Sequence, residues 1–177
     1  LITPSEYIEK YPLMQVATPC RSSWGANGYS EVWLNPSNDY AHKHLHTAGD
    51  RMCELAYKFR DSYDTLNNLD NQIKKLKKEK KPITSITSSS KYRNTKLQVR
   101  ALNQAARELL LAQSSDWLFI ITNNTMVDYA HRRIKDHIGR FTRLYNELNS
   151  GKIDRKFLSE IEEKDCVFPD IDYRIYL

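Results

Sequence analysis

Two tryptophans in the first forty residues have the type and the surroundings best suited to binding chemistry. Trp24 and Gly25 lie in the stretch 20–29 among serines, an asparagine and a second glycine, and Trp33 follows within 31–35. Helical periodicity does not place these side chains. An indole face beside backbone donors suits the apolar C–H face of a sugar ring. The residues therefore predict a sugar-binding loop or, alternatively, two aromatic plugs that anchor the loop to the core.

Three alternating histidines are the second group that could carry chemistry. His42 and His46 are four residues apart and would share one face of a helix, with His44 between them. Two such histidines can hold a zinc ion when a carboxylate completes the set, but Lys43 stands where an HExxH motif has its Glu. We therefore expect no metal site here. Hydrogen bonding at a helix surface or between domains is the simpler prediction.

The carboxylates near the C-terminus are poor candidates for glycosidic chemistry. Retaining enzymes place two carboxylates about 5 Å apart across the scissile bond. Asp170 and Asp172 are followed by Arg174, a salt-bridge partner, whereas Glu162 and Glu163 belong to a predicted exposed helix. We expect structural roles for all four and no catalytic residue in this chain. Nucleophile motifs such as GxSxG and phosphate loops such as GxxxxGK are absent from the sequence.

The positive charge of the chain is local. The net charge is +5, and the segment from Lys74 to Lys81 holds six lysines and one acid, Glu79, which gives 6 − 1 = +5. A phosphate backbone is usually contacted by basic residues spread over a folded face. The lysine run therefore predicts a solvated helix end, and we expect no nucleic-acid partner.

Other classes of protein are disfavoured by the remaining composition. The longest apolar run, 117–121, is far shorter than the roughly 18 residues needed to cross a bilayer, so we expect no membrane partner. Three widely spaced cysteines favour neither a disulfide framework nor a zinc site, and they fit a cytoplasmic protein without cofactors. The chain starts with Leu1, and residues 1–6 lack the features of a secretory signal, so we expect a fragment or a processed piece.

The elements that must position these residues are helical. Prolines and glycines interrupt 1–36, so we predict a loop-rich segment there, with one short strand at 31–34. From 37 onward apolar residues recur at spacings of three and four until Pro82, which predicts one helix of about ten turns capped by Ser37 or Asn38.

The second half predicts further helices. The Ser/Thr-rich stretch 82–95 is predicted to be a mobile connection within the domain, and an amphipathic helix should begin near Lys96. Ser114, Ser115 and Asp116 favour a break before a short buried helix; Thr125 should cap the helix that Gly151 ends, and a short helix should span 154–164. We predict an all-α fold: a loop-rich segment 1–36 bearing the tryptophan loop, and one helical bundle-like domain at 37–177.

Several motifs in one order resemble the C-terminal region of glycoside hydrolase family 57 enzymes, in particular the 1,4-α-glucan branching enzymes. The resemblance covers nearly the whole chain. It rests on the segments Thr3–Tyr7, Ser22–Gly25, Val32–Asn35, His44–His46, Gln104–Trp117 and Phe168–Arg174. The family often has Trp at the position of Tyr40 and Pro at that of Leu118, where this sequence departs from it.

The resemblance implies a helical domain docked on an N-terminal (β/α)7 barrel of the same protein. That barrel would supply a Glu nucleophile and an Asp acid/base for retaining transglycosylation of an α-glucan, as in glycogen biosynthesis. The residues matching the family's substrate contacts are Trp24, Gly25 and Trp33, so this chain alone would bind but not catalyse. Two alternatives stay open: a fragment of a family 57 α-amylase or glucanotransferase, and a free-standing helical interaction domain that uses the lysine run.

Overall fold

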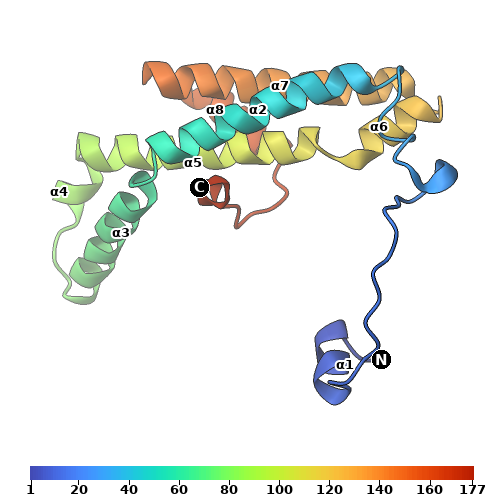
Figure 1. Cartoon of the computed structure of the whole chain (residues 1–177). Coiled ribbons are helices and arrows are strands. Elements are labelled where there is room, and N and C mark those ends of the chain that lie inside the picture. The colour runs from blue at the N-terminus through green and yellow to red at the C-terminus, as the bar shows by residue number, and fades with distance from the viewer. The chain divides into compact units, whose positions relative to one another are not determined.

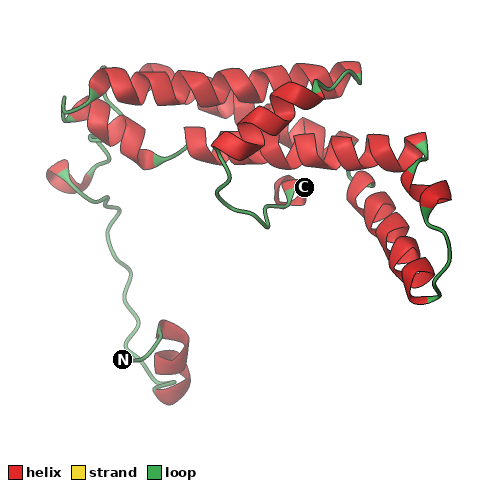
Figure 2. Ribbon diagram, turned by 180° about the vertical axis from the view of Figure 1, so that it is seen from behind, coloured by secondary structure: helices red, strands yellow, loops and turns green.

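A computed structural model describes residues 1–177, apart from the side chain of Ala26. The chain forms two compact units, Leu1–Glu31 and Val32–Leu177. The division lies a few residues before the boundary predicted after position 36. Figures 1 and 2 show helices joined by loops, and no strand occurs within the described range, which confirms the all-α fold class.

The first unit contains a helix that the sequence prediction missed. Helix α1 (Pro4–Lys10) starts with a capping box: Glu6 N donates to Thr3 Oγ1 at 3.3 Å, and Thr3 N donates to the Glu6 carboxylate at 2.7 Å. Proline in the first turn and Glu6 at the third helical position are both helix-start signals. A short 3₁₀ helix, η1 (Ala26–Gly28), follows. The strand predicted at 31–34 is wrong, because these residues form turns.

The long helix predicted for 37–81 is two helices. Helix α2 spans Asp39–Lys58 and α3 spans Ser62–Lys78, with a break between them. No proline or glycine marks this break. The carbonyl of Phe59, at the end of α2, accepts a hydrogen bond of 2.7 Å from the Tyr173 hydroxyl, which satisfies one of the acceptors that a helix end exposes. A distant residue thus stabilises an interruption that local periodicity does not show.

The stretch predicted as a mobile connection, 82–95, contains helical structure. Helix α4 spans Thr84–Thr87, and α5 spans Ser90–Ala112 with Ser89 as its N-cap, several residues before the predicted start at Lys96. The Ser89 hydroxyl accepts from Tyr92 N at 3.2 Å. Serine is among the preferred N-cap residues, so this Ser/Thr-rich composition favours a helix start as well as a loop.

Three further helices lie close to their predicted positions: α6 (Ser115–Thr122), α7 (Val127–Ser150) and α8 (Arg155–Lys164). A terminal 3₁₀ helix, η2 (Tyr173–Tyr176), was not predicted. Gly151 ends α7 with a φ of +70°, as expected of a glycine C-cap, and Asp154 caps α8. The predicted cap Thr125 is wrong, because Met126 occupies the N-cap position of α7.

Two hydrophobic clusters fill the second unit. The larger one is built mainly on α2, α5 and α7 and includes Met52, Leu102, Phe141 and Tyr173, all fully buried. Helix α5 packs against α7, α3, α2 and α8, so it is the central element (Figure 1). The smaller cluster joins Ala41 of α2 to α6 and the start of α7. This second cluster supports the Trp33 segment.

The lysine run lies at a solvated helix end, as the sequence predicts. The lysines of the run 74–81 are all exposed at and beyond the end of α3, where basic residues oppose the negative end of the helix dipole. None of the helices within the described part of the chain combines the length and the apolar composition that a membrane span requires.

Candidate functional site

The tryptophan loop of the first unit is shaped by its own backbone. Ser23 N donates to Gly28 O at 2.6 Å, and Ser30 N donates to Ser23 Oγ at 2.5 Å, so the loop closes on itself. Gly25 has a φ of +76°, a left-handed conformation that favours glycine. Trp24, next to it, is 71% exposed. The loop therefore presents an indole face to solvent from a defined turn, which disfavours the plug alternative for this residue.

A hollow of about 310 Å³ lies in the same loop. Its lining consists of Arg21, Ser22, Gly28, Tyr29 and Ser30. The Tyr29 side chain is itself 73% exposed. Serine hydroxyls, a guanidinium group and an aromatic ring are the groups that hydrogen-bond to sugar hydroxyls and stack on a sugar ring.

Trp33 has different surroundings. It is half-buried in the second unit and packs against the smaller hydrophobic cluster. Its backbone carbonyl shares a hydrogen bond of 2.9 Å with His42 Nε2 at the start of α2. The anchoring alternative thus holds in part for Trp33, because core contacts fix one side of the segment that carries it.

A buried asparagine ties the Trp33 segment to α6. Asn38 is fully buried; its Nδ2 donates to Val32 O at 3.0 Å and to Thr122 Oγ1 at 2.9 Å, and its Oδ1 accepts from Asn35 N at 3.0 Å. Asn38 precedes α2 as predicted, but its side chain makes no capping hydrogen bond. Its role is to fix the turn that holds Trp33, which the sequence prediction did not identify.

The predicted substrate-binding residues divide between the two units. Trp24 and Gly25 belong to Leu1–Glu31, and Trp33 belongs to Val32–Leu177. The hydrogen bonds that close the Trp24 loop lie within the first unit, and the cluster on which Trp33 packs lies within the second. Joint contact of the three residues with one ligand therefore stays a prediction.

The histidines and the C-terminal acids make structural contacts. His42 bonds to the Trp33 carbonyl, and its ring lies 6.0 Å from that of His46 between centroids. Arg174 donates to Asp172 at 2.7 Å, and this hydrogen bond holds the pKa of the Asp172 carboxyl below its usual range. Glu162 is half-buried and paired with Arg100, so its prediction as an exposed residue is wrong.

A buried ionic network joins α5, α7 and the end of α8, and the sequence analysis missed it. Glu108 and His137 are fully buried, and His137 Nδ1 lies 2.6 Å from Glu108 Oε2. Arg140 pairs with Asp165 and lies 3.7 Å from Glu108, and Gln104 Nε2 donates to Glu108 at 2.8 Å. The only signal in the sequence is polar residues on the apolar faces of two helices.

The network has the ligand atoms of a metal site, but an arginine side chain contacts its carboxylates. Glu108, His137 and Asp165 offer ligand atoms within 4.8 Å of one another. The Arg140 guanidinium contacts both carboxylates, so the positive charge that a cation would supply is already present. We interpret this group as a structural network that locks three helices together.

Comparisons with known proteins identify the family of the chain. Residues 75–176 match the sequence family described as 1,4-alpha-glucan branching enzyme, C-terminal. The 1,4-alpha-glucan branching enzyme TK1436 of Thermococcus kodakarensis is 32% identical over an alignment of 172 residues, which covers 94% of this chain and 21% of that protein. The chain belongs to the C-terminal family of the 1,4-α-glucan branching enzymes.

Solved structures of two branching enzymes and an α-amylase share the fold. The crystal structure of TK1436 in complex with glucose and additives matches with a TM-score of 0.71 at 30% identity. The match covers 99% of this chain and 27% of the TK1436 chain. The GH57-type branching enzyme of Pyrococcus horikoshii has a TM-score of 0.70 at 29% identity, with coverages of 99% and 28%. The α-amylase AmyC of Thermotoga maritima has a TM-score of 0.66 at 38% identity, with coverages of 99% and 26%.

The branching-enzyme motif in α5 is structural in this chain. The segment Gln104–Trp117 contributes Gln104 and Glu108 to the buried network, and its end, the Trp117 indole, donates to Leu111 O at 2.7 Å. This segment thus builds the core. The residues predicted to contact substrate lie upstream of it, in Trp24, Gly25 and Trp33.

Proposed function

We propose that this chain is the C-terminal helical part of a retaining 1,4-α-glucan branching enzyme and that it contributes substrate contacts to the cleft of that enzyme. In this proposal Trp24, Gly25 and Trp33 contact the α-glucan. The catalytic carboxylates come from an N-terminal (β/α)7 barrel of the same protein. The chain spans 21% of the branching enzyme TK1436, which leaves room for such a barrel.

The single observation that carries the proposal is the exposed Trp24 in a closed, glycine-dependent turn, within a chain of this family. A tryptophan that is 71% exposed contributes little to a core and leaves its indole accessible to a ligand. Sugar rings present an apolar face that an indole covers, and their hydroxyls suit the serines beside it. The tail carboxylate Asp172 is engaged by Arg174, which fits a binding role without catalysis.

Branching sets a physical requirement that such contacts meet. The enzyme must cut an α-1,4 chain and transfer the segment to a 6-hydroxyl before water reacts with the intermediate. Contacts that hold the acceptor and exclude water favour transfer over hydrolysis. Trp24 and Trp33 stacked on glucose units near the scissile bond would do both.

The test is a branching assay on the complete enzyme that carries this chain. We expect Trp24→Ala to lower the rate of α-1,6 bond formation about tenfold, or about 1.4 kcal/mol of transition-state binding, and to raise the share of hydrolysis. Tyr57→Ala is the matched control, because Tyr57 is an aromatic residue of similar exposure (68%) on α2. Unchanged branching in Trp24→Ala, with the control also unchanged, would contradict the proposal.

A second candidate function is an α-amylase, favoured by one comparison. The α-amylase AmyC of Thermotoga maritima shares 38% of residues with this chain, more than either branching enzyme structure. Product analysis separates the two: a branching enzyme converts amylose to chains with α-1,6 linkages without a matching rise in reducing ends, whereas an amylase releases reducing ends.

Three unpaired, exposed cysteines fit a reducing compartment, so a cytoplasmic location stays our prediction.

A further inference from the structure

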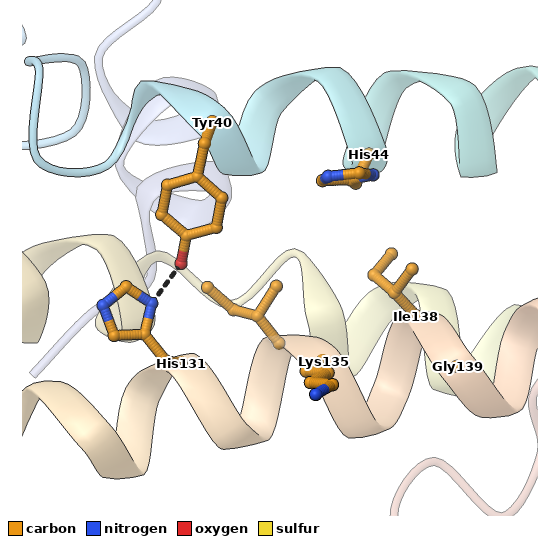
Figure 3. Close-up of a pocket in the computed structure, with 7 residues that line it drawn as sticks. Tyr40, His44, His131, Lys135, Ile138 and Gly139 are labelled. Carbon is orange, nitrogen blue, oxygen red and sulfur yellow. Dashed lines mark hydrogen bonds between the residues drawn. The ribbon is translucent and has the colours of Figure 1, made fainter.

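A groove between α2 and α7 has no role in the site described above. It encloses about 410 Å³, within the usual range for small-molecule sites, and lies wholly in the second unit. Figure 3 shows Tyr40 and His44 reaching it from α2, with His131, Lys135, Ile138 and Gly139 on α7. Ile134 completes its lining.

Tyr40 and His131 form a fixed wall at one end of the groove. The Tyr40 hydroxyl and His131 Nδ1 share a hydrogen bond of 2.5 Å, and the ring centroids lie 5.4 Å apart (Figure 3). Partial burial raises the pKa of Tyr40, so its hydroxyl stays protonated near neutral pH. When that hydroxyl donates to Nδ1, the neutral imidazole carries its proton on Nε2 and can donate from there. The contact therefore orients an aromatic face and prepares a donor beside it.

The opposite side of the groove is apolar and open. Ile134 is buried and Ile138 is half-buried, and both belong to or pack on the smaller hydrophobic cluster. A Cβ added at Gly139 would meet nothing within 4 Å, so the groove stays open there because α7 has no side chain at this position. Glycine in a helix interior costs roughly 0.5–1 kcal/mol relative to alanine, and here packing does not require it.

We propose that this groove is a binding site for glucosyl units of an α-1,4-glucan, lined by none of the residues Trp24, Gly25 and Trp33. The proposal rests on the proposed function, since the α-glucan is the ligand of that function. The lining combines an aromatic face and apolar carbons with donors from two imidazoles and the Lys135 ammonium. This combination matches a sugar ring, which is apolar on its faces and rich in acceptors at its edge.

The lining excludes glycosidic chemistry in the groove. No carboxylate is among its residues, so the pair needed to cleave or transfer a glycosidic bond is missing. Trp33 and Ile138 pack on the same hydrophobic cluster, and His42 of α2 bonds to the Trp33 carbonyl. The groove and the Trp33 segment are therefore supported by the same part of the core.

The test is an NMR titration of this chain with maltoheptaose, an α-1,4 oligosaccharide, with inorganic phosphate as a second probe. We expect saturable shifts of the Gly139 amide and the His131 ring. Gly139→Leu should fill the groove and weaken binding at least about tenfold. Gly49→Leu is the matched control, because Gly49 is also in a helix with nothing within 4 Å of an added Cβ but does not line the groove. Circular dichroism verifies that both variants are folded.

The possible outcomes are distinct. Loss of the His131 shift in Gly139→Leu, with the shifts of Gly49→Leu unchanged, supports the groove. Shifts at Trp24 or Trp33 alone, no saturable shift at all, or equal binding by Gly139→Leu overturn it, and so does a response to phosphate in place of maltoheptaose. The branching assay on Trp24→Ala is separate: if it fails while the groove binds, the proposed function is wrong and the groove stands.

Discussion

The two compact units of the chain hold their structure by different means. In Val32–Leu177, side chains such as Phe141, Leu144 and Leu158 are fully buried, and burial of this kind is the main driving force of folding. In Leu1–Glu31 no described side chain is buried, and Leu13 and Val16 are more than 90% exposed. The first unit depends on local hydrogen bonds, whereas the second has a core.

This contrast explains where binding chemistry can be placed. An exposed tryptophan in a unit where no described side chain is buried can be changed at little cost to folding. Trp33, in contrast, is half-buried and is held by Asn38 and His42. A change at Trp24 therefore tests ligand contact more directly than a change at Trp33.

The largest test of the contrast is to break the buried network. Glu108→Ala leaves His137, Arg140 and Gln104 without their shared acceptor, and removing one partner of a buried ion pair costs about 3–5 kcal/mol. We expect a loss of that size in urea unfolding followed by circular dichroism. Glu160→Ala, at an exposed pair 4.0 Å from Lys156, is the control and should change stability by less than about 0.5 kcal/mol. A small effect at Glu108 would mean that the network does not hold the helices together.

A smaller effect is expected at the junction of the two regions. Asn38→Ala leaves the Asn35 amide without its acceptor, and an unsatisfied buried group of this kind costs about 1–3 kcal/mol. The Val32 carbonyl loses one of two hydrogen bonds and keeps the one from the Thr122 hydroxyl. The change should lower stability and mobilise Trp33, which fluorescence anisotropy or indole NMR relaxation would detect. Asn149→Ala, whose side chain contacts Lys58 on the surface, should do neither. If Trp33 stays immobile in Asn38→Ala, then Asn38 does not fix the segment that carries Trp33.

A third, weaker effect should depend on pH. The pKa of Asp172 is lowered by its hydrogen bond from Arg174, so its stabilising contribution is present above the ordinary pKa of 3.8 and is lost as pH falls through the folded-state value. The pair is partly exposed, so we expect under about 1 kcal/mol. Asp172→Asn should flatten the dependence of the free energy of unfolding on pH in acid. Asp170→Asn is the reference variant and should leave this dependence unchanged. Identical acid slopes for wild type and Asp172→Asn would contradict this assignment.

The smallest effect should be at Trp24. Because this side chain is 71% exposed in a unit without buried residues, Trp24→Ala should change the free energy of unfolding by less than about 0.5 kcal/mol. Trp33→Ala removes contacts with the smaller cluster and should cost more, about 1–3 kcal/mol. Thermal melts of the two variants make the comparison. Equal losses would show that the two units are not as different as their burial indicates.

Much of the helical framework followed from local rules in the sequence. The spacing of apolar residues predicted α7 and α8, Gly151 marked the end of one helix, and Asp154 the start of the next. The start of α1 was also encoded locally, in Thr3 and Glu6, but was overlooked among prolines. These features depend on backbone geometry and on neighbours within one or two turns, so composition and spacing are sufficient to specify them.

What only the tertiary structure decided are the features made by residues far apart in the chain. The break after Phe59 depends on Tyr173, and the buried network depends on α5, α7 and α8 meeting at Glu108. The groove is lined by Tyr40 and His44 of α2 and by residues of α7, among them Gly139. Periodicity identifies the apolar face of each helix but not the helix that covers it. The sequence by itself indicated most of the helices, the family and the tryptophan loop, and packing determined which polar residues are buried and where the surface is hollow.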